Sequence, residues 1–283
     1  MTSSVTAPSS SEPATTADIR LVMIDIDGTL SGQSNQVDPV VIAAIAKALK
    51  QGIHVGIATG RMYRSAVRFH HTIAANTPLC SYQGALIKHP DGDKVYRHWA
   101  IPRDLAQVLI QSFRRHPLIV HTYIDDELYV QELNPLSLAY AERSQVPIHV
   151  LPEDGSLAAD PTKVLAMSED TDLILEIQAV MRDQFPADQL YLTRSVPTFL
   201  EATHPIVNKG TAVRYLAEEV LGLQPHQVMT IGDSDNDIEM LAYAGIGVAM
   251  GNATPDIQAQ ANWVAPTIDQ HGVAAAFEEF VFS

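Results

Sequence analysis

Two aspartates, Asp25 and Asp27, stand one residue apart in the stretch MIDIDGTL, directly after an apolar run. Side chains two apart on a continuing strand share a face, so the two carboxylates can approach one point, and Gly28 lets the backbone turn away tightly. At ~5 Å and an effective dielectric constant of ~20 the two charges repel by on the order of 3 kcal/mol. A hard cation such as Mg2+ would relieve this repulsion and leave one carboxylate free for nucleophilic or proton-transfer chemistry. The alternative is an N-cap or an Asp-Gly turn, which accounts for one aspartate at most.

A second acidic cluster, IGDSDNDIEML, also follows an apolar strand-like run. An EF-hand loop starting at Asp233 is excluded because Ile238 falls where glycine is required and Ala244 where a bidentate glutamate is required. The remaining interpretations are an acidic surface turn and metal ligation by Asp233 and Asp237. Metal ligation explains why acidic residues recur at the ends of two strands.

Two further features of the sequence are consistent with a site that binds an anion. Lys209 opens a predicted helix, where a positive charge is unfavourable unless it faces an anion; the alternative is a solvated surface lysine. Thr59, Gly60 and Arg61 end a second predicted strand, where a hydroxyl and backbone N–H groups could hold phosphoryl oxygens.

These residues lie between alternating strand and helix patterns. Strands are predicted at 19–24, 53–60 and 78–82, with helices over 38–51 and 61–75 between them. The same rhythm returns after Lys209, with helices over 209–221, 236–244 and 271–281 and strands at 227–231 and 246–249. This alternation is typical of a parallel sheet covered on both faces, where ligands bind beyond the carboxyl ends of the strands.

The pattern changes near residue 85. A hairpin is predicted over 86–99 with Asp91-Gly92 at its turn. Four strand-like runs then mix with three helical runs, at 118–124, 127–131, 163–167 and 189–194 and at 103–115, 136–144 and 171–184. We therefore predict one α/β core, 18–84 and 201–283, interrupted by an inserted α+β domain over 85–200.

Composition restricts the partners and the location. The 283 residues are 46% hydrophobic, as in a folded globular protein, and 33 acidic against 18 basic residues give a net charge of -15. That charge disfavours nucleic acid and anionic membrane surfaces as partners. The single cysteine, Cys80, excludes an internal disulfide and favours the cytoplasm. No apolar run approaches the ~18 residues that span a bilayer, and residues 1–17 are predicted to be a disordered tail rather than a targeting segment.

Four motifs in order, DIDGTL, ATGR, NKG and GDSDND, resemble those of the haloacid dehalogenase superfamily of phosphatases. The insertion between the second and third motifs is similar to the α+β cap of the Cof-type subfamily. The resemblance covers the chain from about residue 18 onward. It implies the α/β fold class, with a Rossmann-like parallel-sheet core and an inserted α+β cap domain.

The resemblance also implies roles for the carboxylates. Asp25 would attack phosphorus to form an aspartyl phosphate, and Asp27 would protonate the leaving group and then activate water. Mg2+ would be held by Asp25, the backbone carbonyl of Asp27, and Asp233, with Asp237 in support.

The phosphoryl group has its own implied contacts. Thr59 and Lys209 would bind its oxygens, Gly60 would contribute backbone to the same site, and Asn236 would lie near it. The sequence departs from the family at Gln83, where asparagine is frequent, so contacts carried over to that loop are not assigned.

The predicted function is Mg2+-dependent hydrolysis of a small phosphorylated metabolite, with sugar phosphates as the leading class. A phosphotransferase or mutase would use the same nucleophile but deliver the phosphoryl group to a second hydroxyl. A non-catalytic phosphometabolite sensor is disfavoured, because it needs no nucleophile. The sequence specifies neither an oligomeric state nor the cap residues that select the substrate.

Overall fold

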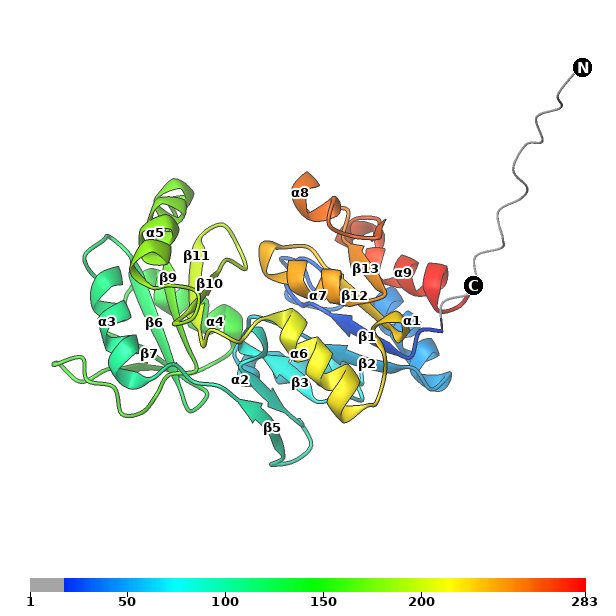
Figure 1. The fold of residues 1–283 in the computed structure, drawn as a ribbon, viewed down its shortest axis with the longest axis horizontal. Helices are drawn as coiled ribbons and strands as arrows, with labels where there is room; N and C mark the ends of the chain where they lie inside the picture. The colour runs from blue at the N-terminus through cyan, green and yellow to red at the C-terminus, as the bar shows by residue number, and fades with distance from the viewer. Residues whose placement is uncertain (1–17) are drawn as a thin grey trace, which may run out of the picture.

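A computed structural model describes residues 18–283, and the predicted tail over 1–17 lies outside the described residues. A five-stranded parallel sheet forms the centre of the larger part (Figure 1). Its strands, in spatial order, are β14 (Trp263–Val264), β13 (Ile246–Ala249), β12 (Val228–Gly232), β1 (Leu21–Ile24) and β2 (His54–Ile57).

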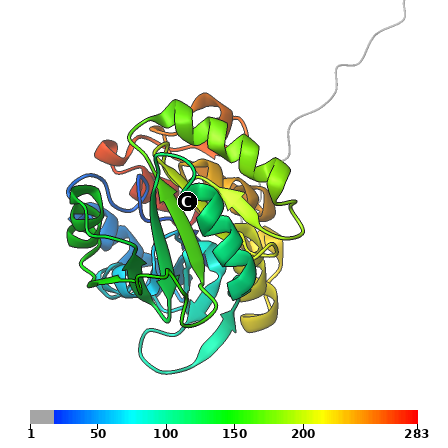
Figure 2. The same cartoon turned by 90° about the vertical axis from the view of Figure 1, so that its left-hand side faces the viewer.

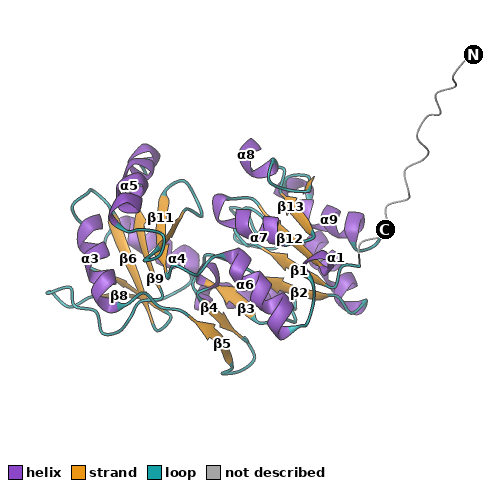
Figure 3. Cartoon of the chain, viewed as in Figure 1, coloured by secondary structure: helices purple, strands orange, loops and turns teal. Residues whose placement is uncertain are grey.

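Both faces of this sheet are covered by helices, which explains why its strands are mostly apolar rather than alternating between apolar and polar residues. Val22 and Ile24 of β1 pack in a cluster with α1 (Pro39–Lys50), α2 (Tyr63–Thr72) and α9 (Gly272–Phe280). Leu21 and Met23 face the opposite side, toward α6 (Lys209–Tyr215) and α7 (Ile238–Tyr243). Figure 3 shows the helices flanking these strands.

The predicted hairpin is present and extends the core. β3 (Leu79–Ser81) forms an isolated parallel bridge to the end of β2, between Ala58 and Cys80. β4 (Leu86–Lys88) pairs antiparallel with β3, and β5 (Val95–His98) pairs antiparallel with β4, which gives the order β3-β4-β5.

A second, six-stranded sheet lies to one side of the core (Figure 1). Its order is β10 (Tyr191–Thr193), β11 (Phe199–Thr203), β9 (Lys163–Met167), β6 (Ile119–Ile124), β7 (Glu127–Val130) and β8 (Ile148–Val150). All neighbours are antiparallel except β7 and β8. We call this sheet and its helices the cap.

The two faces of the cap sheet have different neighbours. α3 (Arg103–Phe113) and α5 (Thr171–Gln184) pack on one face, the one turned to the viewer in Figure 2. The other face packs against α4 (Pro135–Ser144) and against the core residues Met62 and Tyr82. A continuous apolar contact therefore joins the cap to the core.

The predicted fold class is confirmed: a parallel α/β core is combined with an inserted α+β part. The structure adds β8, β11, β14 and the short α8 (Pro255–Gln258), which the sequence patterns did not predict. β11 runs across the expected boundary at 200, and the hairpin of β4 and β5 is joined to the core because β4 pairs with the core strand β3. Among residues 18–283, no helix has both the length and the apolar character that a membrane crossing requires.

Candidate active site

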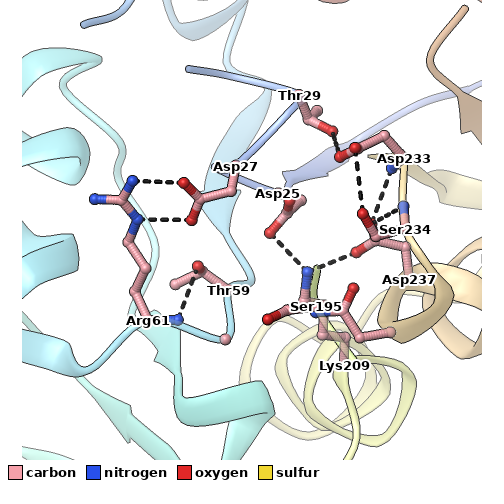
Figure 4. A network of polar contacts seen from close by, with 12 residues as sticks. Asp25, Asp27, Thr29, Thr59, Arg61, Ser195, Lys209, Asp233, Ser234 and Asp237 are labelled. Atoms are coloured by element: carbon pink, nitrogen blue, oxygen red, sulfur yellow. Dashed lines mark hydrogen bonds and ion pairs between the residues drawn. The ribbon is translucent and has the colours of Figure 1, made fainter. Parts of the chain in front are cut away.

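The site forms where the central strands β1 and β12 end side by side. Ile24 pairs with Ile231 in the parallel register, and the Asp25 N–H donates to the Ile231 carbonyl at 3.0 Å. Asp25 follows β1 directly, and Asp233 follows β12. The prediction that both acidic motifs follow strand ends is therefore correct, and the structure adds that the two strands are neighbours, so that the motifs meet at one edge (Figure 4).

Lys209 lies at the centre of these carboxylates. Its Nζ donates to Asp25 Oδ1 and to Asp237 Oδ1, both at 2.6 Å, and its side chain is fully buried. Burial alone would lower the pKa of this lysine, but the charges of Asp237 and Asp25 outweigh it and raise the pKa. Asn208 caps α6 by accepting from the Thr211 N–H at 2.7 Å, which fixes the helix start that presents Lys209.

The loop after β12 is held by Asp237. Asp237 Oδ2 accepts from the backbone N–H groups of Asp233 at 2.9 Å and Ser234 at 3.0 Å. Asp233 Oδ1 in turn accepts from Thr29 Oγ1 at 2.8 Å. Gly28 has a φ of +82°, and a Cβ there would lie 2.2 Å from Asp233 Oδ2, so only glycine allows the two loops to approach this closely.

Asp25, Asp233 and Asp237 could hold a cation together. One carboxylate oxygen from each lies within 4.8 Å of the others. Burial raises the pKa of Asp25 well above its usual range, and neighbouring carboxylates raise it further against the effect of Lys209. Burial and the charge of Asp237 raise the pKa of Asp233 to about 7. These raised pKa values mean that the clustered carboxylates ionise fully only when further positive charge is close by. Oxygen ligands of this kind suit a hard divalent cation such as Mg2+.

Asp27 is placed differently from Asp25. Arg61 Nε and Nη2 bind its two oxygens at 2.7 and 2.5 Å, and its side chain is 36% exposed. Burial would raise the pKa of Asp27, but the hydrogen bonds and charge of Arg61 outweigh it and lower the pKa. The pKa values of the two aspartates are therefore shifted in opposite directions, upward for Asp25 and downward for Asp27.

The predicted phosphoryl-binding residues occupy the loops around these carboxylates. Thr59 Oγ1 accepts from the Arg61 N–H at 3.2 Å, and the Gly60 carbonyl accepts from Lys163 Nζ at 2.7 Å. Asn236 Nδ2 donates to Gln83 Oε1 at 3.0 Å.

A cavity of about 1150 Å3 joins the core and the cap. Six of the eight predicted site residues line it: Asp25, Asp27, Thr59, Gly60, Asp233 and Asn236. The other two, Lys209 and Asp237, do not line it and contact the carboxylates from within the protein.

Sequence reasoning did not identify the cap side of this cavity. Its cap residues include Tyr140, Arg143, Lys163, Ser195 and Glu201. A signal was present for two of them, because Lys163 and Glu201 are single charges within the apolar strand runs KVLAM and FLEAT. Charged residues at such buried positions are rare unless they are paired.

A parallel α/β core with carboxylates at its strand ends and an inserted second domain over the cavity defines a class of hydrolase. The sequence model for haloacid dehalogenase-like hydrolases matches residues 22–277. The chain belongs to this family, which confirms the resemblance predicted from the four motifs.

Relatives align along nearly the whole chain. A Haemophilus influenzae protein named "Putative phosphatase" is 30% identical over 261 residues, covering 92% of this chain and 97% of its own. A Bacillus subtilis 5-amino-6-(5-phospho-D-ribitylamino)uracil phosphatase is 26% identical over 265 residues, covering 92% and 97%. The crystal structure of a haloacid dehalogenase-like hydrolase from Bacteroides thetaiotaomicron superposes with a TM-score of 0.81 at 25% identity, covering 92% and 99%.

Proposed function

We propose that this hydrolase is a Mg2+-dependent phosphatase of small phosphorylated metabolites that works through an aspartyl phosphate on Asp25. The observation that carries the proposal is the position of Asp25 at the end of β1. There it lines the cavity, contacts Lys209 at 2.6 Å and lies within 4.8 Å of Asp233 and Asp237. Relatives named as phosphatases support this reaction class.

In the first step, an Asp25 oxygen attacks phosphorus and the bond from phosphorus to the ester oxygen breaks. Asp25 Oδ2 receives no hydrogen bond from residues 18–283, so its lone pairs are available, whereas Oδ1 is held by Lys209. For this step Asp27 is in its acid form, with one of its two Arg61 contacts released, and it gives its proton to the departing ester oxygen, which leaves as an alcohol. The phosphoryl group is then bonded to Asp25.

In the second step, water attacks phosphorus and the acyl phosphate bond breaks. Asp27 takes the water proton, inorganic phosphate leaves, and the Asp25 carboxylate is restored. Arg61 orients Asp27 through both carboxylate oxygens, at 2.7 and 2.5 Å. Thr59 and the backbone at Gly60 bind the phosphoryl oxygens, with Asn236 nearby.

Asp25, the backbone carbonyl of Asp27, and Asp233 would hold Mg2+, and Asp237 would support it. When bound, the ion supplies positive charge that lowers the repulsion between the nucleophile and the phosphate. Lys209 contributes a second positive charge from the buried side of Asp25.

Sugar phosphates are the leading substrate class. A cavity of about 1150 Å3 accommodates a small metabolite in addition to its phosphate. Its polar lining from the cap suits hydroxyl groups, and one Bacillus subtilis relative is named for a 5-phospho-D-ribityl compound.

The direct test is phosphate release from a panel of phosphorylated metabolites, with Mg2+ and with EDTA. Asp25→Asn is compared with wild type and with Asp188→Asn, the same change at an exposed cap position that does not line the cavity. We expect release that requires metal, falls by about 10^4-fold in Asp25→Asn and is unchanged in Asp188→Asn.

Other outcomes have defined meanings. Full activity of Asp25→Asn would reject the nucleophile. Transfer of the phosphoryl group to an added alcohol or second sugar, with little free phosphate, would identify a phosphotransferase. Binding without any turnover of the panel would favour a sensor.

A further inference from the structure

Lys163 is a buried cation outside the carboxylate cluster described above. It begins strand β9 of the cap, and its side chain is 2% exposed. Its Nζ donates to the Gly60 carbonyl at 2.7 Å and to Glu201 Oε2 at 3.0 Å. The same ammonium lies 4.9 Å from the Tyr123 ring and 5.8 Å from the Tyr82 ring. Its contacts therefore come from both the cap and the core.

Glu201 on β11 completes this network. Its side chain is 1% exposed, and its Oε2 also accepts from Gln83 Nε2 at 3.2 Å. Its other oxygen accepts from Ser195 Oγ, which lies on the loop before β11. Gln83 continues the network into the core, because its Oε1 accepts from Asn236.

The backbone is strained to place Gln83. Tyr82 and Gln83 both have left-handed φ angles, of +53° and +61°, which non-glycine residues rarely adopt. Such strain persists only where surrounding contacts hold it, and it is concentrated at functional sites. Gly60 also makes room for this side chain, since a Cβ there would lie 2.4 Å from Gln83 Nε2.

A buried ion pair is a poor source of stability, because removing two charges from water offsets most of their attraction. If this ion pair served only to stabilise the cap, its hydrogen-bond partners would be expected to lie within the cap. Here the pair reaches Gly60 on one side and, through Gln83, Asn236 on the other. Both are core residues to which the proposed function assigns phosphoryl contacts.

We propose that Lys163 and Glu201 are positioning residues: from the cap they hold the loop at 59–61 and the Gln83–Asn236 pair in the arrangement that binds the phosphoryl group. The inference rests on the proposed function for the role of that loop. It makes the cap part of the phosphate site, in addition to its covering the substrate.

The test uses the double variant Lys163→Met/Glu201→Gln, since removing the lysine alone would leave a buried carboxylate unpaired. Ser112→Ala is the control: Ser112 is a buried cap residue that accepts from Gln184 at 2.9 Å and does not line the cavity. We measure the Kd for inorganic phosphate, kcat and KM for the best substrate, and amide hydrogen exchange of the peptide 58–63.

We expect the double variant to bind inorganic phosphate and substrate about tenfold more weakly, the loss of roughly one charge-assisted hydrogen bond, with kcat changed by less than about threefold. Exchange of peptide 58–63 should become about tenfold faster, while Ser112→Ala changes none of these values. Glu201→Gln, which is isosteric, should show the same direction and serves as the test if the double variant fails to fold.

Unchanged exchange of peptide 58–63 would overturn the inference, as would faster exchange with an unchanged Kd for inorganic phosphate. A lower melting temperature with neither change would show a structural pair only. The proposed function fails separately, if the wild type releases no phosphate from any substrate; the exchange measurement still decides whether the pair holds the loop.

Discussion

The two buried lysines of this protein have contrasting surroundings. Lys209 lies among three carboxylates of the core, those of Asp25, Asp233 and Asp237, an excess of two negative charges when all are ionised. Lys163 has one carboxylate partner, Glu201, and its remaining contacts are a backbone carbonyl and two aromatic rings.

This difference separates two uses of a buried cation. The Lys209 cluster is electrostatically incomplete, so it favours the arrival of a further cation, and one divalent ion would balance it. The Lys163 pair is already neutral and hydrogen-bonded, so it has no need of a ligand and instead joins two parts of the chain. A buried lysine thus indicates a ligand site only where the surrounding charge is unbalanced.

Between the two lysine sites, the larger effect is expected from removing Lys209. Lys209→Met should lower kcat/KM by about 10^3-fold or more, because it removes a positive charge beside the nucleophile. It should also reduce the free energy of unfolding by about 3–5 kcal/mol, since buried carboxylates lose their partner. Lys163→Met/Glu201→Gln should act mainly on KM. Steady-state kinetics and urea unfolding measure both, and a larger loss of kcat in the cap variant would reverse the comparison.

The next effect is a pH dependence of stability that comes from Asp233 in the Lys209 cluster. Burial raises the pKa of Asp233 from its ordinary value of 3.8 to about 7 in the metal-free protein. The folded state therefore binds its proton more tightly than the unfolded state, and this contribution to stability is present below pH ~4 and lost as pH rises through about 7. Its size is on the order of 4 kcal/mol at most, because each pKa unit between 3.8 and about 7 corresponds to about 1.4 kcal/mol.

Asp233→Asn isolates this contribution. In EDTA, the variant should melt at the same temperature as the wild type near pH 4 and at a higher temperature at pH 7.5. Asp188→Asn, at an exposed cap position, should follow the wild type at both. An Asp233→Asn protein that melts below the wild type at pH 7.5 would contradict the electrostatic account.

Adding Mg2+ should have a somewhat smaller effect. An ion that binds only the folded state at 100 times its Kd stabilises by about 2.7 kcal/mol. We expect Mg2+ to raise the melting temperature of the wild type and of Lys163→Met/Glu201→Gln, but not that of Asp233→Asn. Differential scanning fluorimetry over a Mg2+ titration measures this, and equal shifts in all three proteins would place the ion elsewhere.

The core half of the site was largely predictable from the sequence. Strand ends in a parallel sheet meet at one edge, so Asp25 and Asp233 could be expected to lie together once the alternating pattern was read. The bonds of Lys209 to Asp25 and Asp237 were not predicted, because a helix start with a lysine gives no partner for it. Arg61 was noted at its strand end, but its pairing with Asp27 depends on how two loops pack.

The cap half was not predictable in the same way. Lys163 and Glu201 are 38 residues apart and become neighbours only because β9 and β11 pair. β11 itself was not predicted, as its short apolar run follows a proline-containing loop and has no alternation. A single charge in a buried strand indicates that a partner exists, but identifying the partner requires the register of the sheet.

The smallest effect is expected at a partly exposed ion pair that joins the cap to the core. Arg194 and Asp235 contact at 2.5 Å, but the Asp235 side chain is 46% exposed, in contrast to both buried lysine pairs. Exposed pairs contribute about 0–1 kcal/mol, because solvent screens the charges and ordering the side chains costs entropy. Asp235→Asn should therefore change the free energy of unfolding by less than about 1 kcal/mol and leave kcat within about twofold, although Asp235 belongs to the same GDSDND motif as Asp233. Urea unfolding and kinetics on the best substrate test this. A loss of stability or of kcat comparable to that of Lys209→Met would mean that membership of the motif, rather than burial of unbalanced charge, determines which residues are needed for stability and activity.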